Sequence, residues 1–396
     1  MAKKQAIKRQ HKQKLRKQER AIERKLATYS YPVKCGLLTS HQPQHDELSS
    51  LEPSALLPPI ASIAFDTTSS FIATSHHDYS LNIFKVPFAK HGPPSKQIAH
   101  EIIIPSDKHP VRLPMAPTFS LRHHLIAYHN SIYNIDISQK SKMSNSSVPL
   151  LKLPGLASNA QFFYKDKFVL FSDNGRLCCN HIHLAEAPSV SLRSNFKLSH
   201  KPALSWSFAG SITAVTSINS SLSEVVAVAS NDRNIRILDA ESGSVSWCRK
   251  DQRGQKSVHS IAFPNPVASN LLPPETFNLL AGASTSDGGM ISLYDLRTAE
   301  LISSLRGHLN RKERCGISFS PCMRYISSGS EAAGGAALYD LRKPDVMLTK
   351  IGARNAKGQP LLDGTITSVA FNPLYPQVAT GSLGGRLRFF TEQPLY

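Results

Sequence analysis

Residues 314–342, RCGISFSPCMRYISSGSEAAGGAALYDLR, decide the fold because their apolar residues follow the pattern of short β-strands. The pattern predicts strands at 316–319, 325–330 and 336–340, with a turn at 320–323 between the first two. The stretch is therefore interpreted as one unit of a repeat, and the rest of the chain is expected to contain further copies.

Seven units with this arrangement are predicted along the chain. They lie at residues 62–84, 117–136, 160–178, 212–239, 260–305, 314–342 and 368–390. Five share a first-strand pattern of Ser or Gly, then Ile or Val, a small residue and Phe, or a close version of it. The units at 117–136 and 160–178 are degenerate. Phe263, Phe319 and Phe371 are spaced by 56 and then 52 residues, so long loops are expected between strands.

Two dipeptides identify the kind of repeat. Gly307-His308 precedes the quoted stretch, and Tyr339-Asp340 ends its third strand. They resemble the Gly-His and Trp-Asp signatures of WD repeats, with Tyr in place of Trp. The chain thus resembles the WD40-repeat β-propeller family. Within it, residues 307–322 and 370–381 resemble the C-terminal blades of the WD repeat-containing protein 27 type.

The resemblance implies an all-β fold, a single seven-bladed WD-type β-propeller over residues 29–396. The last unit ends after its third strand, whereas a blade has four. A spare strand near the N-terminus supplies the missing one, so residues 33–38 are predicted to pair with residues 386–390. This pairing closes the ring and leaves no long open edge.

The hydrogen-bonded side-chain set of a full WD repeat is eroded in this sequence. Gly307-His308 is the one surviving Gly-His, and neither Trp206 nor Trp247 falls in a third strand. Acidic residues remain in turns at Asp78, Asp232, Asp287 and, as a substitute, Glu331. Stability is therefore expected to depend mainly on apolar packing between sheets.

Residues 1–28 form a basic arm that is predicted to be helical or disordered. The first 25 residues hold 11 Lys and Arg against two Glu, which is half of the chain's net charge of +18. The arm is interpreted as a site for an anionic partner, either RNA phosphate or an acidic protein, or as a nuclear import signal. The alternative is a solvated charge run without a partner. The candidate contacts are Lys3, Lys4, Lys8, Arg9, Lys12, Lys14, Arg16, Lys17 and Arg20.

No catalytic or cofactor-binding motif is present, so the chain is not expected to be an enzyme. Its histidine pairs lack a third ligand at a plausible spacing, so no metal or cofactor is predicted. The pair His76-His77 is expected to be exposed in a turn. The six cysteines follow no disulfide or zinc pattern, which favours reduced thiols and an intracellular protein, cytoplasmic or nuclear. No apolar run is long enough to span a membrane.

A repeated motif, Tyr-Asp-Leu-Arg, ends at Arg297 and again at Arg342. It resembles the Asp-x-Arg box of substrate receptors for cullin-4 ubiquitin ligases, and the resemblance implies that both arginines contact the ligase adaptor. The alternative is that each arginine pairs locally with an acidic residue.

The sequence therefore predicts a non-catalytic scaffold that binds proteins through the propeller faces and is a monomer within a larger complex. Its arm is predicted to bind a second, anionic partner. Two alternatives remain: a nuclear or nucleolar ribonucleoprotein factor whose arm binds RNA phosphate, and a cullin-4 substrate receptor.

Overall fold

The computed structural model describes most of the chain after residue 57. The described residues are 38–41, 58–78, 80–86, 98–103, 118–121, 124–128, 131–136, 149–152, 157, 159–173, 175–185, 195–220, 223–250, 256–264, 278–332, 335–344, 346–351, 364–374 and 377–392. Apart from the 3₁₀ turn Ser286–Gly288, every regular element in these ranges is a β-strand. None of them contains a helix long and apolar enough to cross a membrane.

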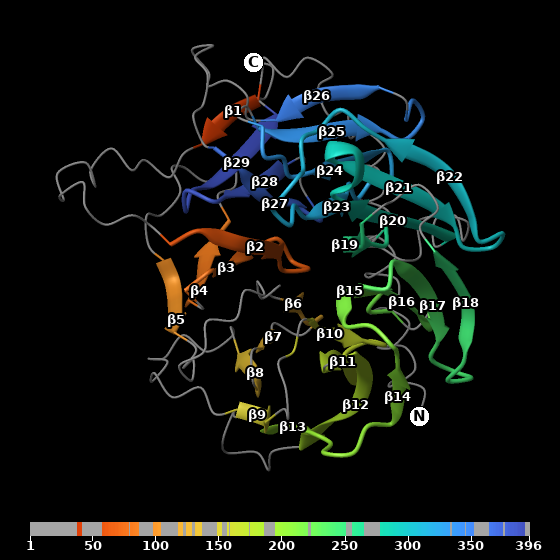
Figure 1. Ribbon diagram of the computed structural model, residues 1–396. Helices are drawn as coiled ribbons and strands as arrows, with labels where there is room; N and C mark the ends of the chain where they lie inside the picture. The colour runs from red at the N-terminus through yellow and green to blue at the C-terminus, as the bar shows by residue number, and fades with distance from the viewer. Residues whose placement is uncertain are drawn as a thin grey trace, which may run out of the picture.

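The strands form sheets that surround a common centre, as in a β-propeller (Figure 1). The first strand of each sheet lies nearest the centre, and the later strands follow outwards in antiparallel order. The first two sheets are β2 (Ile60–Phe65), β3 (Phe71–His76), β4 (Ser80–Lys85) and β5 (Ile98–Ile103), then β6 (Thr118–Phe119), β7 (His124–Tyr128), β8 (Ser131–Asp136) and β9 (Pro149–Lys152).

The next two sheets differ in strand number. They are β10 (Ala160–Phe163), β11 (Phe168–Asp173), β12 (Arg176–Ala185), β13 (Asn195–Leu198) and β14 (Leu204–Ser207), then β15 (Ile212–Ser217), β16 (Val225–Ser230), β17 (Asn234–Asp239) and β18 (Val245–Lys250).

The remaining three sheets complete the ring. They are β19 (Val258–Ala262), β20 (Leu279–Ser284), β21 (Met290–Asp295) and β22 (Glu300–Leu305); then β23 (Ile317–Phe319), β24 (Tyr325–Ser328), β25 (Ala336–Asp340) and β26 (Met347–Ile351); then β27 (Ile366–Phe371), β28 (Gln377–Ser382), β29 (Leu387–Glu392) and β1 (Leu38–His41).

The prediction of a single seven-bladed propeller is wrong, because the ring contains six four-stranded blades and one sheet of a different form. The sheet from β10 to β14 has five strands. Its strand β12 is ten residues long and pairs with β11 along one edge. Along the other edge it has two partners: residues 176–179 pair with β14, and residues 182–185 pair with β13. The sequence between Cys178 and Ala185 contains no Gly or Pro, so the strand continues beyond the predicted end.

The ring is closed by an N-terminal strand, but at a different place from the predicted one. Strand β1 pairs with β29 in the register Leu38↔Glu392 to His41↔Phe389. The sequence had predicted that residues 33–38 pair with residues 386–390. Residues 33–37 lie outside the described ranges. A second closure lies nearer the centre, where the Thr367 hydroxyl donates to the carbonyl oxygen of Ile60 at 2.6 Å.

Hydrogen bonds of the same kind join other neighbouring sheets near the centre. The Thr118 hydroxyl donates to the carbonyl oxygen of Ala160 at 3.0 Å. The Thr213 hydroxyl likewise donates to Val258 at 2.5 Å, between β15 and β19. These bonds connect the inner strands of consecutive sheets and fix how the sheets sit around the centre.

The hydrophobic core lies between adjacent sheets rather than within one of them. Between the β15–β18 and β19–β22 sheets, the side chains of Ile235, Ile261 and Leu280 pack together and are almost fully buried. Similar clusters fill the next interfaces around the ring. Burial of this apolar surface between the sheets stabilises their arrangement around the ring.

Candidate anion-binding pocket

One edge of three neighbouring sheets carries a pocket of about 370 Å³. In each sheet the first strand begins where its antiparallel partner ends, as in the pairs Ile212↔Ser230, Val258↔Ser284 and Ile317↔Ser328. Residues just before the first strand and just after the second therefore meet on the same face of the propeller. The volume falls within the range of about 300–1,000 Å³ that is typical of ligand pockets.

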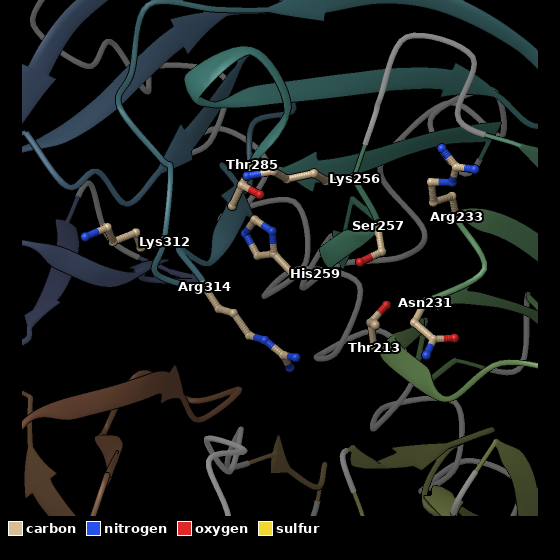
Figure 2. A pocket seen from close by; sticks show the side chains of 9 residues that line it. All are labelled: Thr213, Asn231, Arg233, Lys256, Ser257, His259, Thr285, Lys312 and Arg314. Atoms are coloured by element: carbon tan, nitrogen blue, oxygen red, sulfur yellow. The ribbon is translucent and has the colours of Figure 1, made fainter.

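Nine residues from these loop and strand ends line the pocket. They are Thr213, Asn231, Arg233, Lys256, Ser257, His259, Thr285, Lys312 and Arg314. Figure 2 shows Thr213 and Asn231 on one side of the view, Lys312 and Arg314 on the other, and His259 between them. The lining is polar and cationic, and it contains no carboxylate and no aromatic ring apart from the His259 imidazole.

The four cations of the lining have no ionic partner among the residues that the structure describes. Arg233, Lys256, Lys312 and Arg314 all have exposed side chains, and none of them forms an ion pair within these ranges. Although Arg314 is exposed overall, partial desolvation of its guanidinium lowers its pKa. Positive charges held together without a counter-charge favour binding of an anion.

Asp232 and Asp287, which lie close to lining residues in the sequence, are engaged in ion pairs with other arginines. Asp232 binds Arg236 in a salt bridge with 2.5 Å between the charged atoms, and Asp287 binds Arg306 at 3.2 Å. Burial alone would raise the pKa of Asp232, but hydrogen bonds from Arg236, Ser230 and Asn234 outweigh it and hold that pKa below its usual range. These two aspartates therefore neutralise Arg236 and Arg306, which do not line the pocket.

Glu331 holds the loop that carries two of the pocket cations. Its Oε1 accepts backbone N–H groups from three consecutive residues, Arg311 at 2.8 Å, Lys312 at 2.5 Å and Glu313 at 2.7 Å. Burial alone would raise the pKa of Glu331, and these hydrogen bonds lower it overall. Glu331 is thus committed to the backbone, and it positions Lys312 and Arg314 at the pocket.

His259 sits between two sheets at the floor of the pocket. Its Nε2 donates to the carbonyl oxygen of Cys315 at 3.1 Å, which joins β19 to the segment before β23. Burial lowers its pKa to about 4, and the charge of Arg314 acts in the same direction. The imidazole is therefore neutral near pH 7 and adds no charge of its own to the lining.

The side-chain set of a WD repeat was expected to be eroded, and two sheets contain altered versions of it. In the β23–β26 sheet, His308 Nδ1 and the Tyr339 hydroxyl are 2.8 Å apart, so Tyr takes the place of Trp as the partner of the histidine. In the β15–β18 sheet, Ser230, Asp232 and Arg236 form a hydrogen-bonded set in which an arginine occupies the third strand. Burial lowers the pKa of His308 to about 4.

The two arginines of the repeated Tyr-Asp-Leu-Arg motif lie away from the pocket. Arg297 Nη2 binds Asp295 at 2.8 Å, and Arg342 Nη2 binds Asp340 at 2.8 Å. Both arginine side chains are exposed, with 59% and 64% of their surface accessible. Each is paired with the aspartate two residues before it, as the alternative of local pairing predicts, and neither lines the pocket.

The histidine pairs, the basic arm and the possible metal ligands lie apart from the pocket lining or outside the described residues. His76 was expected to be exposed, but it is buried at the end of β3, where its Nδ1 lies 2.9 Å from the carbonyl oxygen of Pro58. His181 and His183 are exposed and stack with ring centroids 4.7 Å apart. All candidate contacts in residues 1–28 lie outside the described residues. Within the described ranges, no group of His, Cys, Asp and Glu is placed to hold a metal ion.

Comparison with known families adds one match. Residues 358–391 match the family model of the WD domain, G-beta repeat. The chain contains a WD repeat. The matched segment includes β27, β28 and nearly all of β29, which belong to the sheet completed by β1. A WD-repeat β-propeller supports a general role as a protein-interaction scaffold.

No contiguous motif marks the pocket cations in the sequence, although the repeats contain a signal for them. Lys256, Lys312 and Arg314 all lie just before a first strand, and Arg233 lies just after a second strand. Aligning the three units by their strands would have placed these residues at one edge. The charges of the arm are recognisable from the sequence because they lie close together. The pocket charges come from three separate repeat units.

Proposed function

We propose that the chain is a non-catalytic scaffold whose propeller binds a partner protein at the cationic pocket. The observation that carries this proposal is the gathering of Arg233, Lys256, Lys312 and Arg314 on one face without a carboxylate partner in the described ranges. A WD-repeat propeller supplies a rigid support for such loops, and the closed ring keeps them in a fixed arrangement. The partner contributes the negative charge that the pocket lacks.

A comparison of captured partners tests this proposal. The variant Lys256→Gln/Arg314→Gln removes two pocket charges from exposed side chains, and Lys201→Gln/Lys343→Gln removes two exposed charges elsewhere. The full chain and both variants are used to capture proteins from cells, and the captured sets are quantified by mass spectrometry. A defined set of proteins is expected to be lost with the pocket variant and kept with the control. Identical sets for all three would contradict the proposal.

The basic arm is proposed to recruit a second, anionic partner. Support comes from its composition, in which 11 cations face two carboxylates within 25 residues. An acidic protein is one candidate, and RNA phosphate is the other, which would make the chain a nuclear or nucleolar ribonucleoprotein factor. Deleting residues 1–28 and measuring RNA binding over a salt series separates them, because phosphate contacts weaken steeply as salt rises.

The cullin-4 receptor role is retained as a separate proposal for Arg297 and Arg342. What supports it is that both arginines are exposed and are oriented by their own aspartates. The variant Arg297→Gln/Arg342→Gln should abolish capture of the ligase adaptor. Unchanged capture would remove this role and leave the local ion pairs as the full explanation of the motif.

We also propose a cellular location and an assembly state for the chain. An intracellular location, in the cytoplasm or the nucleus, and a monomer within a larger complex both fit a scaffold with free thiols at Cys178, Cys179, Cys248, Cys315 and Cys322. The narrower resemblance to WD repeat-containing protein 27 stays a prediction, and no partner is carried over from it.

A further inference from the structure

We propose that the pocket binds a phosphorylated serine or threonine side chain of the partner protein. This inference rests on the proposed scaffold function and specifies what the pocket recognises. It depends on the charge of the lining, on its uncommitted hydrogen-bond donors and on the kinds of side chain that it lacks.

The charge of the lining matches a phosphate better than a carboxylate. Four cations contribute to one pocket, whereas a glutamate or aspartate carries a single negative charge. A phosphorylated side chain carries about −1.5 to −2 charges at pH 7 and presents three acceptor oxygens. Arg233 and Arg314 have guanidinium groups, which donate two parallel hydrogen bonds to phosphate oxygens. A dianion therefore uses more of this lining than a carboxylate can.

Neutral donors in the lining are available to the same ligand. Ser257 and Thr285 each carry a hydroxyl group, and Asn231 carries a side-chain amide. None of these three side chains has a hydrogen-bond partner among the residues that the structure describes. Thr213 differs, because its hydroxyl group donates a hydrogen bond to the carbonyl oxygen of Val258. Donors without partners next to unpaired cations form a site that is arranged for an anion with several acceptor oxygens.

The lining also distinguishes a phosphorylated protein from a nucleic acid. Single-stranded nucleic acids are usually bound by aromatic side chains that stack on the bases, combined with a long cationic groove. The described lining contains no Phe, Tyr or Trp, and its four cations come from loop and strand ends of three separate sheets. An isolated phosphate on a peptide fits this arrangement, whereas a run of nucleotides finds no stacking surface.

The loop that carries Lys312 and Arg314 is held by a carboxylate that binds its backbone. Glu331 follows the end of β24, and its carboxylate accepts hydrogen bonds from the backbone N–H groups of residues 311–313. It therefore fixes the loop of Lys312 and Arg314 without neutralising the guanidinium of Arg314. The charge of Lys312 also helps to lower the pKa of Glu331, so the counter-charge that a ligand phosphate would supply is the one that Arg314 lacks.

The test uses the full chain and three degenerate peptide libraries, whose central residue is phosphoserine, serine or glutamate. The wild-type chain is expected to prefer phosphoserine peptides over the other two by at least about tenfold, the effect of one charge-assisted hydrogen bond. This preference should disappear in Lys256→Gln/Arg314→Gln and persist in Lys201→Gln/Lys343→Gln. Because every variant keeps residues 1–28, non-specific binding of phosphate to the arm cancels in the comparison.

Three results would overturn the inference. Equal binding of glutamate and phosphoserine peptides, lost in the pocket variant, would mean that the pocket accepts any acidic side chain, so that the scaffold proposal survives without phosphate. A preference that is unchanged in the pocket variant would place phosphate binding elsewhere in the chain. Pocket-dependent binding of a single-stranded uridine oligomer, without binding of any peptide library, would make the ligand RNA and would contradict the scaffold proposal as well.

Discussion

The pocket cations and the two motif arginines are both exposed, yet they differ in their partners. Arg297 and Arg342 each lie 2.8 Å from a carboxylate oxygen of the aspartate two residues earlier. Lys256 and Arg314 have no carboxylate within ion-pair distance in the described ranges. Two regions with the same kind of side chain thus have opposite electrostatic roles, since one is internally balanced and the other is open to a ligand.

This difference teaches that the number of positive charges does not locate a binding surface. An exposed ion pair adds about 0–1 kcal/mol to stability and leaves little net charge to attract a partner. Unpaired cations add nothing to folding, and their mutual repulsion must be offset by the packing beneath them. The pocket is therefore expected to depend on a rigid support, whereas the motif arginines are not.

The largest expected effect comes from removing that support. Leu280 is fully buried between two of the sheets that carry the pocket. We expect Leu280→Ala to lower the free energy of unfolding by about 2–5 kcal/mol, because it removes apolar contacts and leaves a cavity. Val346 is 69% exposed and serves as the control, since Val346→Ala should change stability by less than about 0.5 kcal/mol. Denaturant unfolding of both variants gives the comparison, and equal losses would contradict a packed support.

Acid should destabilise the fold through His259 and His308. Burial lowers the pKa values of His259 and His308 from 6.5 to about 4. The unfolded chain therefore binds more protons between these values, so this contribution to stability is complete above pH 6.5 and is lost as the pH falls through 4. We expect a loss on the order of 3 kcal/mol for each of the two residues.

Unfolding curves recorded from pH 7 to pH 4 measure this loss. His308→Gln should flatten part of the profile, because one of the two titrating groups is removed. A phosphoserine ligand sharpens the comparison further: it should reduce the acid sensitivity that comes from His259 in the pocket and leave that of His308 unchanged. A profile that is flat down to pH 4 in the wild-type chain would show that the histidines are not held neutral by burial.

A smaller effect is expected from the aspartate of the second motif. Asp340 is buried and accepts hydrogen bonds from Arg342 at 2.8 Å and from Arg324 at 3.2 Å. The bond from Arg342 is the main cause that keeps the pKa of Asp340 below its usual range. Asp340→Asn should therefore cost about 1 kcal/mol at pH 7, since the partner arginines are partly solvated.

The sign of the pH dependence checks that assignment. A depressed pKa gives stability that is present above the unfolded value of 3.8 and is lost as the pH falls further. The difference between Asp340→Asn and the wild-type chain should thus shrink below pH 3.8. A difference that stays constant from pH 7 to pH 3 would mean that the variant acts by packing and not by charge.

The smallest effect is expected at Arg297. Its pair with Asp295 lies at the surface, so Arg297→Gln should change the unfolding free energy by no more than about 0.5 kcal/mol. Thermal unfolding in low and high salt measures this, and the small difference should vanish in high salt. A larger loss that salt does not affect would indicate a structural role that the aspartate pair does not explain.

The sequence predicted the strands well where apolar alternation and turns are regular. Its strands at 212–239 and 314–342 agree with β15 to β17 and β23 to β25 within a few residues. It failed at β12 and β14, because the long strand carries no internal turn and its second partner begins only at Leu204. It also placed the closing strand about three to five residues too early, since the alternation around residues 33–41 does not fix a register.

The pocket was not predictable by the same means, because it has no contiguous motif. Its residues come from positions 213 to 314, and they meet only once the sheets are arranged around the centre. The burial of His76 was missed for a related reason, since its partner Pro58 precedes the first predicted strand of that sheet. In both cases the deciding contacts join segments whose proximity follows from the ring and not from local pattern.

The most direct test compares the two regions in one binding experiment. Fluorescence anisotropy with a labelled degenerate phosphoserine peptide mixture is measured for the full chain, for Lys256→Gln/Arg314→Gln and for Arg297→Gln/Arg342→Gln. Our account predicts that the pocket variant binds at least about tenfold more weakly and that the motif variant binds like the wild type. Equal losses in both variants, or a loss only in the motif variant, would contradict the claim that unpaired cations define the binding surface.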